Sequence, residues 1–117
     1  MSDNLGCVFC GIVANRVDAD IVMSWPDALA IVPLNPVTPG HLLVIPRGHV
    51  TDYRSNPIVT GTTFARAAQI ADGPANLITS AGSLATQTVF HLHVHIVPRR
   101  PDDGLALPWT GQGASDE

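Results

Sequence analysis

The sequence predicts one small domain that combines five β-strands with one main helix. Its 117 residues suit a single domain, and a hydrophobic share of 45% is enough for a compact core. Short apolar runs separated by Pro, Gly, Asn and Asp are typical of strands joined by turns. Residues 58–71 form the one segment that is long enough, and roughly patterned, for a helix of several turns.

The clearest strand signal lies in residues 90–100, where three histidines alternate with bulky apolar residues. Alternation with a period of two places successive side chains on opposite faces of a strand. We therefore expect a strand over residues 87–98, with an apolar face opposite a face that carries His91, His93 and His95. Side chains two apart lie about 6.5–6.8 Å from each other, which is close enough for the three imidazoles to converge on one small group.

The other elements are predicted from apolar runs and from the residues that interrupt them. Three prolines within residues 33–39 remove backbone donors and fix φ, which requires a loop there. Pro57 stands near the first position of the predicted helix, where proline is favoured. The remaining predicted elements are a helical turn at 12–14 and strands at 21–25, 28–32, 41–46 and 75–81.

The charge pattern excludes several classes of chemistry. The formal net charge is -4, and all six basic residues are arginine. Without lysine the chain cannot form a Schiff base or a lysine-bearing phosphate loop. Because no basic run extends beyond Arg99 and Arg100, binding to the backbone of a nucleic acid is not expected.

The sequence also indicates a compartment. No apolar run approaches the roughly 18–20 residues that a membrane span needs, so no membrane partner is expected. The polar start, Met-Ser-Asp-Asn, is unlike a signal peptide, and the expected location is the cytoplasm. In that reducing compartment, cysteines stay reduced unless they bind a metal.

The two cysteines, Cys7 and Cys10, are three positions apart near the start of the chain. This spacing fits a disulfide, a thioredoxin-like redox pair or half of a zinc site. A redox pair usually follows a strand in a βαβ unit, and no such unit is predicted here. A zinc site needs two more ligands, which the histidines of this chain can supply, so zinc is the favoured interpretation.

The histidines are the strongest functional signal. An imidazole titrates near neutral pH and can serve as nucleophile, acid, base or metal ligand. Three in register opposite an apolar face favour a functional interpretation over a structural one. His41 and His49 lie at opposite ends of a predicted strand, and each taken alone is as compatible with an incidental as with a functional role.

Residues 91–97 match the pattern His-φ-His-φ-His-φ-φ, in which φ is an apolar residue, and with its flanking motifs the chain resembles the histidine triad family. The resemblance covers residues 7–100, the expected domain, between a tail at 1–6 and a tail at 101–117. It implies an α+β fold with a five-stranded antiparallel sheet, a helix packed across it and pairing into a homodimer. The other matching motifs are Cys7-x-x-Cys10, Asn35-Pro36, Pro39-Gly40-His41, Val44 to His49, Asn76, Gly82 and Gln87 to Val89.

The resemblance also implies an activity. The family acts on nucleoside phosphoramidates, nucleotidyl esters or dinucleoside polyphosphates, so a purine nucleotide or its conjugate is the expected ligand. His93 would attack the α-phosphorus and form a nucleotidyl-histidine intermediate, which water then hydrolyses. The carbonyl of His91 would fix the tautomer of His93. His95 would bind a phosphate oxygen or protonate the leaving group, and His41 would support the triad.

Substrate-binding residues are implied in the same way. Thr88 and the amides near Thr86 would hold the phosphate, and Gln87 would lie near the leaving group. Ser80 stands where the family commonly has a phosphate-contacting asparagine, and Pro33 stands where it often has a ribose-binding Asp or Asn. The residues expected to bind substrate are Thr86, Gln87, Thr88, Ser80 and Asn35.

A subset of the family binds zinc, and the matching positions here are Cys7, Cys10, His49 and His91. Two thiolates and two imidazoles make a closed structural site, which would attach the N-terminal segment to the histidine segment. Two alternatives remain open: a metallohydrolase with all three triad histidines on one catalytic metal, and a nucleotide-binding or interaction module with little turnover. The departures at Pro33 and Ser80 motivate the second alternative.

Overall fold

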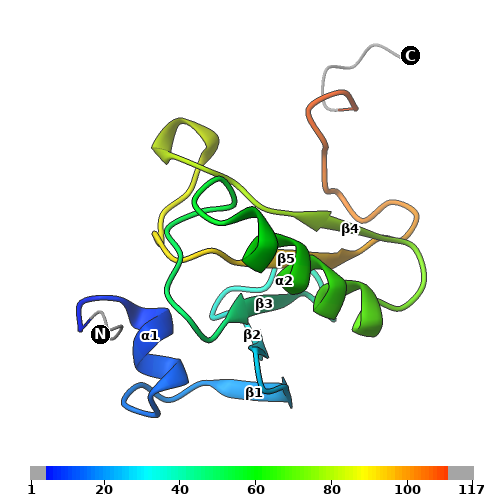
Figure 1. Cartoon of the computed structure of the whole chain (residues 1–117). Coiled ribbons are helices and arrows are strands. Elements are labelled where there is room, and N and C mark those ends of the chain that lie inside the picture. Colours follow the sequence, from blue (N-terminus) through cyan, green and yellow to red (C-terminus); the bar gives the residue numbers. More distant parts are fainter. Residues whose placement is uncertain (1–4, 111–117) are drawn as a thin grey trace.

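The computed structural model describes residues 5–110 and shows one five-stranded antiparallel sheet with a helix across it (Figure 1). The strand order is β1-β2-β3-β5-β4, and each neighbouring pair is antiparallel. The predicted α+β architecture is therefore confirmed. The elements are α1 (Val8–Val13), β1 (Asp20–Ser24), β2 (Ala28–Val32), β3 (Leu42–Pro46), α2 (Pro57–Ile70), β4 (Ala75–Ile78), the 3-10 helix η1 (Ser83–Ala85) and β5 (Val94–Pro98).

Alternate residues of the central strands supply two separate cores, one on each face of the sheet. Leu29 and Ile45 pack with Phe9 of α1 on one face. Ala30 and Val44 pack with Ala67 of α2 on the other. This division follows from the period of two along a strand. Val94 and Ile96 of β5 also belong to the α2 core, so His95 between them points to the face that α1 covers.

Helix α2 begins where the sequence predicts it. The Asn56 side chain accepts a hydrogen bond of 3.2 Å from the amide of Val59, and Pro57 occupies the first turn. Thr63 and Ala67 form the buried face of the helix. The hydroxyl of Thr63 is satisfied by a 2.8 Å bond to the carbonyl of Val59, which allows a polar residue in the core.

The histidine strand is shorter than predicted, because β5 begins at Val94 rather than at residue 87. The preceding residues bond elsewhere: the amide of Leu92 donates to Val50 at 2.6 Å, and the Thr79 hydroxyl donates to the carbonyl of His93 at 2.7 Å. Pro46 ends β3 at this point, since proline offers no donor to extend the ladder. His91 and His93 therefore lie in the segment that leads into the strand.

Other boundaries differ from the predictions in detail. Helix α1 begins at Val8, earlier than the predicted turn at 12–14, because the Cys7 side chain caps it. Strand β4 ends at Ile78 rather than at residue 81. Phe90 is 45% exposed, so the predicted apolar face does not extend to it. Within residues 5–110, neither helix has the length and apolar character needed to cross a membrane.

Candidate functional site

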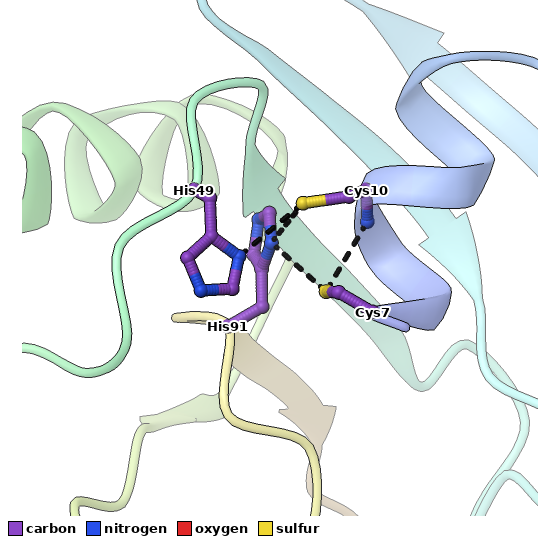
Figure 2. Close-up of side chains that lie close together, drawn as sticks. All are labelled: Cys7, Cys10, His49 and His91. Carbon is purple, nitrogen blue, oxygen red and sulfur yellow. Dashed lines mark hydrogen bonds between the residues drawn. The ribbon is translucent and has the colours of Figure 1, made fainter. Parts of the chain in front are cut away.

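Two cysteines and two histidines from three parts of the chain meet beside the sheet (Figure 2). Cys7 caps α1 and Cys10 lies in its first turn, whereas His49 follows β3 and His91 precedes β5. Their ligand atoms all lie within 4.8 Å of one another. The Nδ1 atom of His91 is 3.5 Å from the Sγ atoms of both cysteines, and Nδ1 of His49 is 3.2 Å from Sγ of Cys10.

The hydrogen bonds around this cluster suit a metal ion. Nε2 of His91 lies 2.9 Å from the carbonyl of Pro46, and a carbonyl can only accept, so Nε2 carries the proton. The lone pair of Nδ1 then faces the sulfurs, which is how metal-binding histidines are usually oriented. Burial lowers the pKa of His91 to about 4, which keeps the ring neutral at pH 7. Two sulfurs and two imidazoles form the donor set of a structural zinc site.

The three triad histidines do not converge on one group. Phe9 makes edge contacts with His91 at 5.7 Å and with His93 at 5.1 Å between ring centroids. His91 instead faces the cysteines, while His93 contacts His95 at 5.2 Å. The expectation of a single convergent cluster is wrong because His91 and His93 precede the regular strand. This arrangement also argues against a catalytic metal held by all three histidines.

His93 is held in one tautomer. Its Nδ1 atom lies 2.9 Å from the carbonyl of His91, so Nδ1 carries the proton and Nε2 keeps its lone pair. The Thr79 hydroxyl holds the His93 carbonyl from the other side. Burial lowers the pKa of His93, although the bond to the His91 carbonyl acts in the opposite direction. At neutral pH the ring therefore presents an unprotonated Nε2.

A second hydrogen-bond chain fixes the tautomer of His95. The amide of Val37 donates to Nδ1 of His41 at 3.1 Å, so Nε2 of His41 carries the proton. That Nε2 lies 3.0 Å from Nδ1 of His95, which must accept. Hence Nε2–H of His95 is its remaining polar group. Burial, followed by the charges of His93 and His41, lowers the pKa of His95 to about 4, and burial also lowers that of His41.

A cavity of about 350 Å³ opens beside these two histidines. Ser80 and Thr86, both expected to bind substrate, line it, whereas His93 does not. Thr86 adopts a left-handed backbone conformation (φ 72) at the end of η1. The cavity is lined by Val37, His41, Asn76, Ile78, Ser80, Thr86, His95, Val97, Arg99 and residues 104–107.

The other predicted substrate residues lie elsewhere. Gln87 is buried, and both donors of its amide are used within the chain, on the carbonyls of Thr51 and Val89 at 2.8 and 3.1 Å. The Gln87 side chain thus holds the 82–89 loop in place. Thr88 is exposed and lines a different hollow, together with Cys7 and His49. Asn35 lies exposed in the proline-rich loop.

Several residues that shape the site were not anticipated from the sequence. The backbone groups of Val37 and Pro46 set two histidine tautomers, and a backbone group carries no signature in the residue type. Thr79 holds the His93 carbonyl, and a lone threonine at the end of a strand gives no distinct signal. Arg99 bonds Asp103 at 2.8 Å and so attaches the segment that forms one wall of the cavity. The four-residue spacing of that ion pair is visible in the sequence.

Comparison with known proteins identifies the family. A model of the HIT domain matches residues 14–102. The chain belongs to the HIT (histidine triad) family. A curated relative from Mycobacterium tuberculosis, an uncharacterised HIT-like protein, is 36% identical over 111 residues, which cover 86% of this chain and 76% of the relative.

Several solved structures share the fold. A Streptococcus mutans protein matches with a TM-score of 0.85 and 34% identity, covering 91% of this chain and 73% of that one. A zinc-bound histidine triad protein from Mycobacterium smegmatis has a TM-score of 0.77 and 37% identity. The match covers 87% of this chain and 81% of that one. A structure described as a HIT family hydrolase, from Clostridium thermocellum, has a TM-score of 0.72 and 31% identity. The match covers 85% of this chain and 95% of that one.

Proposed function

We propose that this HIT protein is a nucleotidyl hydrolase or transferase that acts at the α-phosphorus of purine nucleoside phosphoramidates, nucleotidyl esters or dinucleoside polyphosphates. The observation that carries the proposal is the hydrogen bond between Nδ1 of His93 and the His91 carbonyl. It leaves a neutral, oriented Nε2 beside His95, which is the state that a histidine nucleophile requires. The solved structure described as a HIT family hydrolase supports the same reaction class.

In the first step, Nε2 of His93 forms a bond to the α-phosphorus while the bond from phosphorus to the leaving nitrogen or oxygen breaks. The electron pair of that bond stays on the leaving atom, which takes a proton from a water molecule. In the second step, the resulting hydroxide attacks phosphorus, and the pair of the histidine–phosphorus bond returns to Nε2. One water is consumed, and a nucleoside monophosphate is released.

His95 would serve this reaction as a neutral hydrogen-bond donor. Because His41 donates to its Nδ1, a second proton on that nitrogen would meet the Nε2–H of His41. The remaining Nε2–H of His95 can stabilise the charge on a phosphate oxygen in the transition state. The family resemblance implies two alternative roles for His95. This hydrogen-bond chain favours the binding of a phosphate oxygen over protonation of the leaving group. Ser80 and Thr86 would add donors from the cavity wall. Thr88 and Asn35, which lie outside this cavity, are further proposed contacts of the substrate.

A zinc ion would be held by Cys7, Cys10, His49 and His91, and it would serve as a structural cross-link between α1 and the histidine segment. Because four protein ligands would leave no open position on such an ion, we assign the metal no step in the reaction. Its effect on catalysis would pass through His91, whose ring belongs to the cluster and whose carbonyl orients His93.

Replacement of the nucleophile tests the proposed function. We expect His93→Ala to lower kcat/KM for adenosine phosphoramidate hydrolysis by about 1000-fold or more, because the covalent step needs the imidazole. Rapid quenching and intact-protein mass spectrometry should detect a nucleotidyl adduct on wild type and none on the variant. Matching thermal unfolding would show that the variant is folded. Wild-type activity in the variant would contradict the mechanism, and binding without turnover in wild type would favour the binding-module alternative.

We also propose that two copies pair through β4 and α2. β4 lies at one edge of the sheet, so its outer backbone groups are available to another strand. Beside it, Tyr53, Phe64, Leu77 and Ile78 surround a hollow of about 400 Å³. Tyr53 and Ile78 are 41% and 37% exposed, which leaves apolar surface for a second copy to cover.

A further inference from the structure

The cavity beside His95 has a composition that selects among the proposed substrates. We infer that it receives the leaving group, and that it favours uncharged, apolar leaving groups over phosphate chains. This inference rests on the proposed function and narrows its substrate class. It also makes residues 104–107 a determinant of specificity.

The position of the cavity relative to the nucleophile supports the first part. In phosphoryl transfer, the attacking and leaving atoms lie roughly in line on opposite sides of phosphorus. His95 lines the cavity and its ring contacts His93, whereas His93 does not line it. A phosphate held at His95 would therefore have His93 on one side and the cavity extending away from it. The leaving group would depart into that space.

The walls of the cavity are largely apolar. Ile78 and Val97 contribute from β4 and β5, and Leu105 and Leu107 contribute from the segment after β5. Burial of apolar surface against such walls stabilises a bound hydrocarbon. A phenyl or alkyl group attached to the leaving atom would gain this stabilisation, and a hydrated phosphate chain would not.

The charge balance of the cavity disfavours a phosphate chain. Arg99 is the one basic residue among those that line it, apart from the neutral histidines. Its Nε atom bonds Asp103 at 2.8 Å, and its terminal nitrogens bond Asn76 at 2.8 Å and the Leu105 carbonyl at 2.6 Å. The carboxylate neutralises the guanidinium, and the whole chain has no lysine. A diphosphate group would thus enter an apolar site without an available cation, which is costly.

The same contacts attach the wall to the end of β5. The Asp103 carboxylate accepts hydrogen bonds from the amides of Arg100 and Leu105 at 3.1 and 3.0 Å, besides those from Arg99. Arg99 in turn donates to the Leu105 carbonyl. The arginine is therefore a positioning residue that holds Leu105 against the cavity, and not a ligand for phosphate.

Matched substrates test the inference with the full chain. We would compare two purine nucleoside 5′-phosphoramidates whose phenylalkyl amines differ only by a carboxylate at the far end of the ring, together with a dinucleoside triphosphate. The expected kcat/KM is about tenfold or more higher for the uncharged amine than for its carboxylate analogue. The dinucleoside triphosphate should be the poorest of the three.

Two substitutions of Leu107 test whether the preference for the uncharged amine arises in this cavity. Val22→Lys, on the opposite edge strand, is the matched control. Leu107→Lys should reduce or reverse the preference for the uncharged amine, whereas the control should keep it. Leu107→Ser should weaken that preference yet leave the Kd of nucleoside monophosphate, which lacks a leaving group, within about twofold. These results would support the assignment.

Contrary results separate the inference from the proposed function. A lower affinity of Leu107→Ser for nucleoside monophosphate would place the nucleoside, and not the leaving group, in the cavity and overturn the inference. Preference of the wild type for the carboxylate analogue or the dinucleoside triphosphate would also overturn it, while leaving hydrolysis through His93 intact. Failure to hydrolyse any of these substrates would overturn the proposed function, and with it the inference.

Discussion

At the scale of single residues, the site depends on which ring nitrogen carries a proton. The bond from His93 to a carbonyl leaves Nε2 with an unshared lone pair, and the chain from Val37 through His41 leaves Nε2–H of His95 as a donor. Two chemically identical side chains thus take opposite roles because their hydrogen-bond partners differ. A substitution that changes a partner would change the chemistry without removing a histidine.

The lowered pKa of His95 predicts a loss of stability in mild acid. The pKa falls from the ordinary value of 6.5 to about 4 on folding, so between these values the unfolded chain binds a proton that the folded chain does not. The stabilisation is therefore present above about pH 6.5 and is lost as the pH falls through 4. We expect a contribution on the order of 1–3 kcal/mol between pH 7 and 4.

Urea unfolding at pH 7 and pH 4 measures this contribution. In His95→Gln the decrease in unfolding free energy between the two pH values should be smaller than in wild type, because glutamine does not titrate. Asn35→Gln, in an exposed loop, serves as a control without a titratable change. An equal decrease in wild type and His95→Gln would show that His95 titrates normally in the folded protein.

At the scale of elements, α1 connects the Cys-His cluster to His93, the proposed nucleophile. It carries Cys7 at its cap and Cys10 in its first turn, and Phe9 between them packs against both His91 and His93. The shortened β5 leaves His91 free of the ladder, so its ring can face the cysteines while its carbonyl faces His93. A small helix outside the sheet would thereby affect the geometry of the proposed reaction.

Loss of the cluster should therefore reduce stability and turnover together. For Cys10→Ser we expect zinc content to fall from about one per chain, and the unfolding free energy to fall by more than about 3 kcal/mol. Turnover should decrease about 10–100-fold at temperatures where the variant is folded, because the His91 carbonyl loses its fixed position. Elemental analysis, thermal unfolding and kcat measure the three effects, with the exposed Val8→Ala on the same helix as control. Loss of zinc with an unchanged kcat would show that the cluster does not position His93.

At the scale of the whole molecule, the sheet order places the metal-ligand cluster apart from the proposed contact surface at β4. The metal cluster lies near α1, the histidines lie at the start of β5 beside the cavity, and β4 forms an edge of the sheet. A pairing at β4 would leave the metal cluster on the outside of the assembly.

This arrangement predicts a dimer that a charge on β4 disrupts. Wild type at micromolar concentration should show twice the mass of one chain in light scattering coupled to gel filtration. Ile78→Arg should shift it to the monomer mass, because a charge in a contact surface costs several kcal/mol when it is buried without a partner. Val22→Arg, on the opposite edge strand, should leave the mass unchanged. A monomeric wild type would contradict the pairing.

Local patterns of residue type are enough to predict most elements of the fold and the grouping of the metal-binding residues. The period of two in residues 90–100, Pro57 at the start of the helical segment and the breakers between strands are local properties. They predict both β5 and α2, although β5 begins later than the pattern indicates. The grouping of Cys7 and Cys10 with two histidines followed from spacing and family resemblance, since thiolates and imidazoles suit zinc in any fold. The structure brings these four residues together as expected.

Tertiary contacts decided the rest. The divergence of His91 from His93, the buried position of Gln87 and the cavity wall at residues 104–107 all depend on hydrogen bonds to backbone groups far along the chain. Every residue carries the same amide and carbonyl, so residue types cannot indicate which backbone group will meet a given side chain. The tautomers of the histidines, and thus their chemical roles, are set only when the folded chain brings those groups within reach.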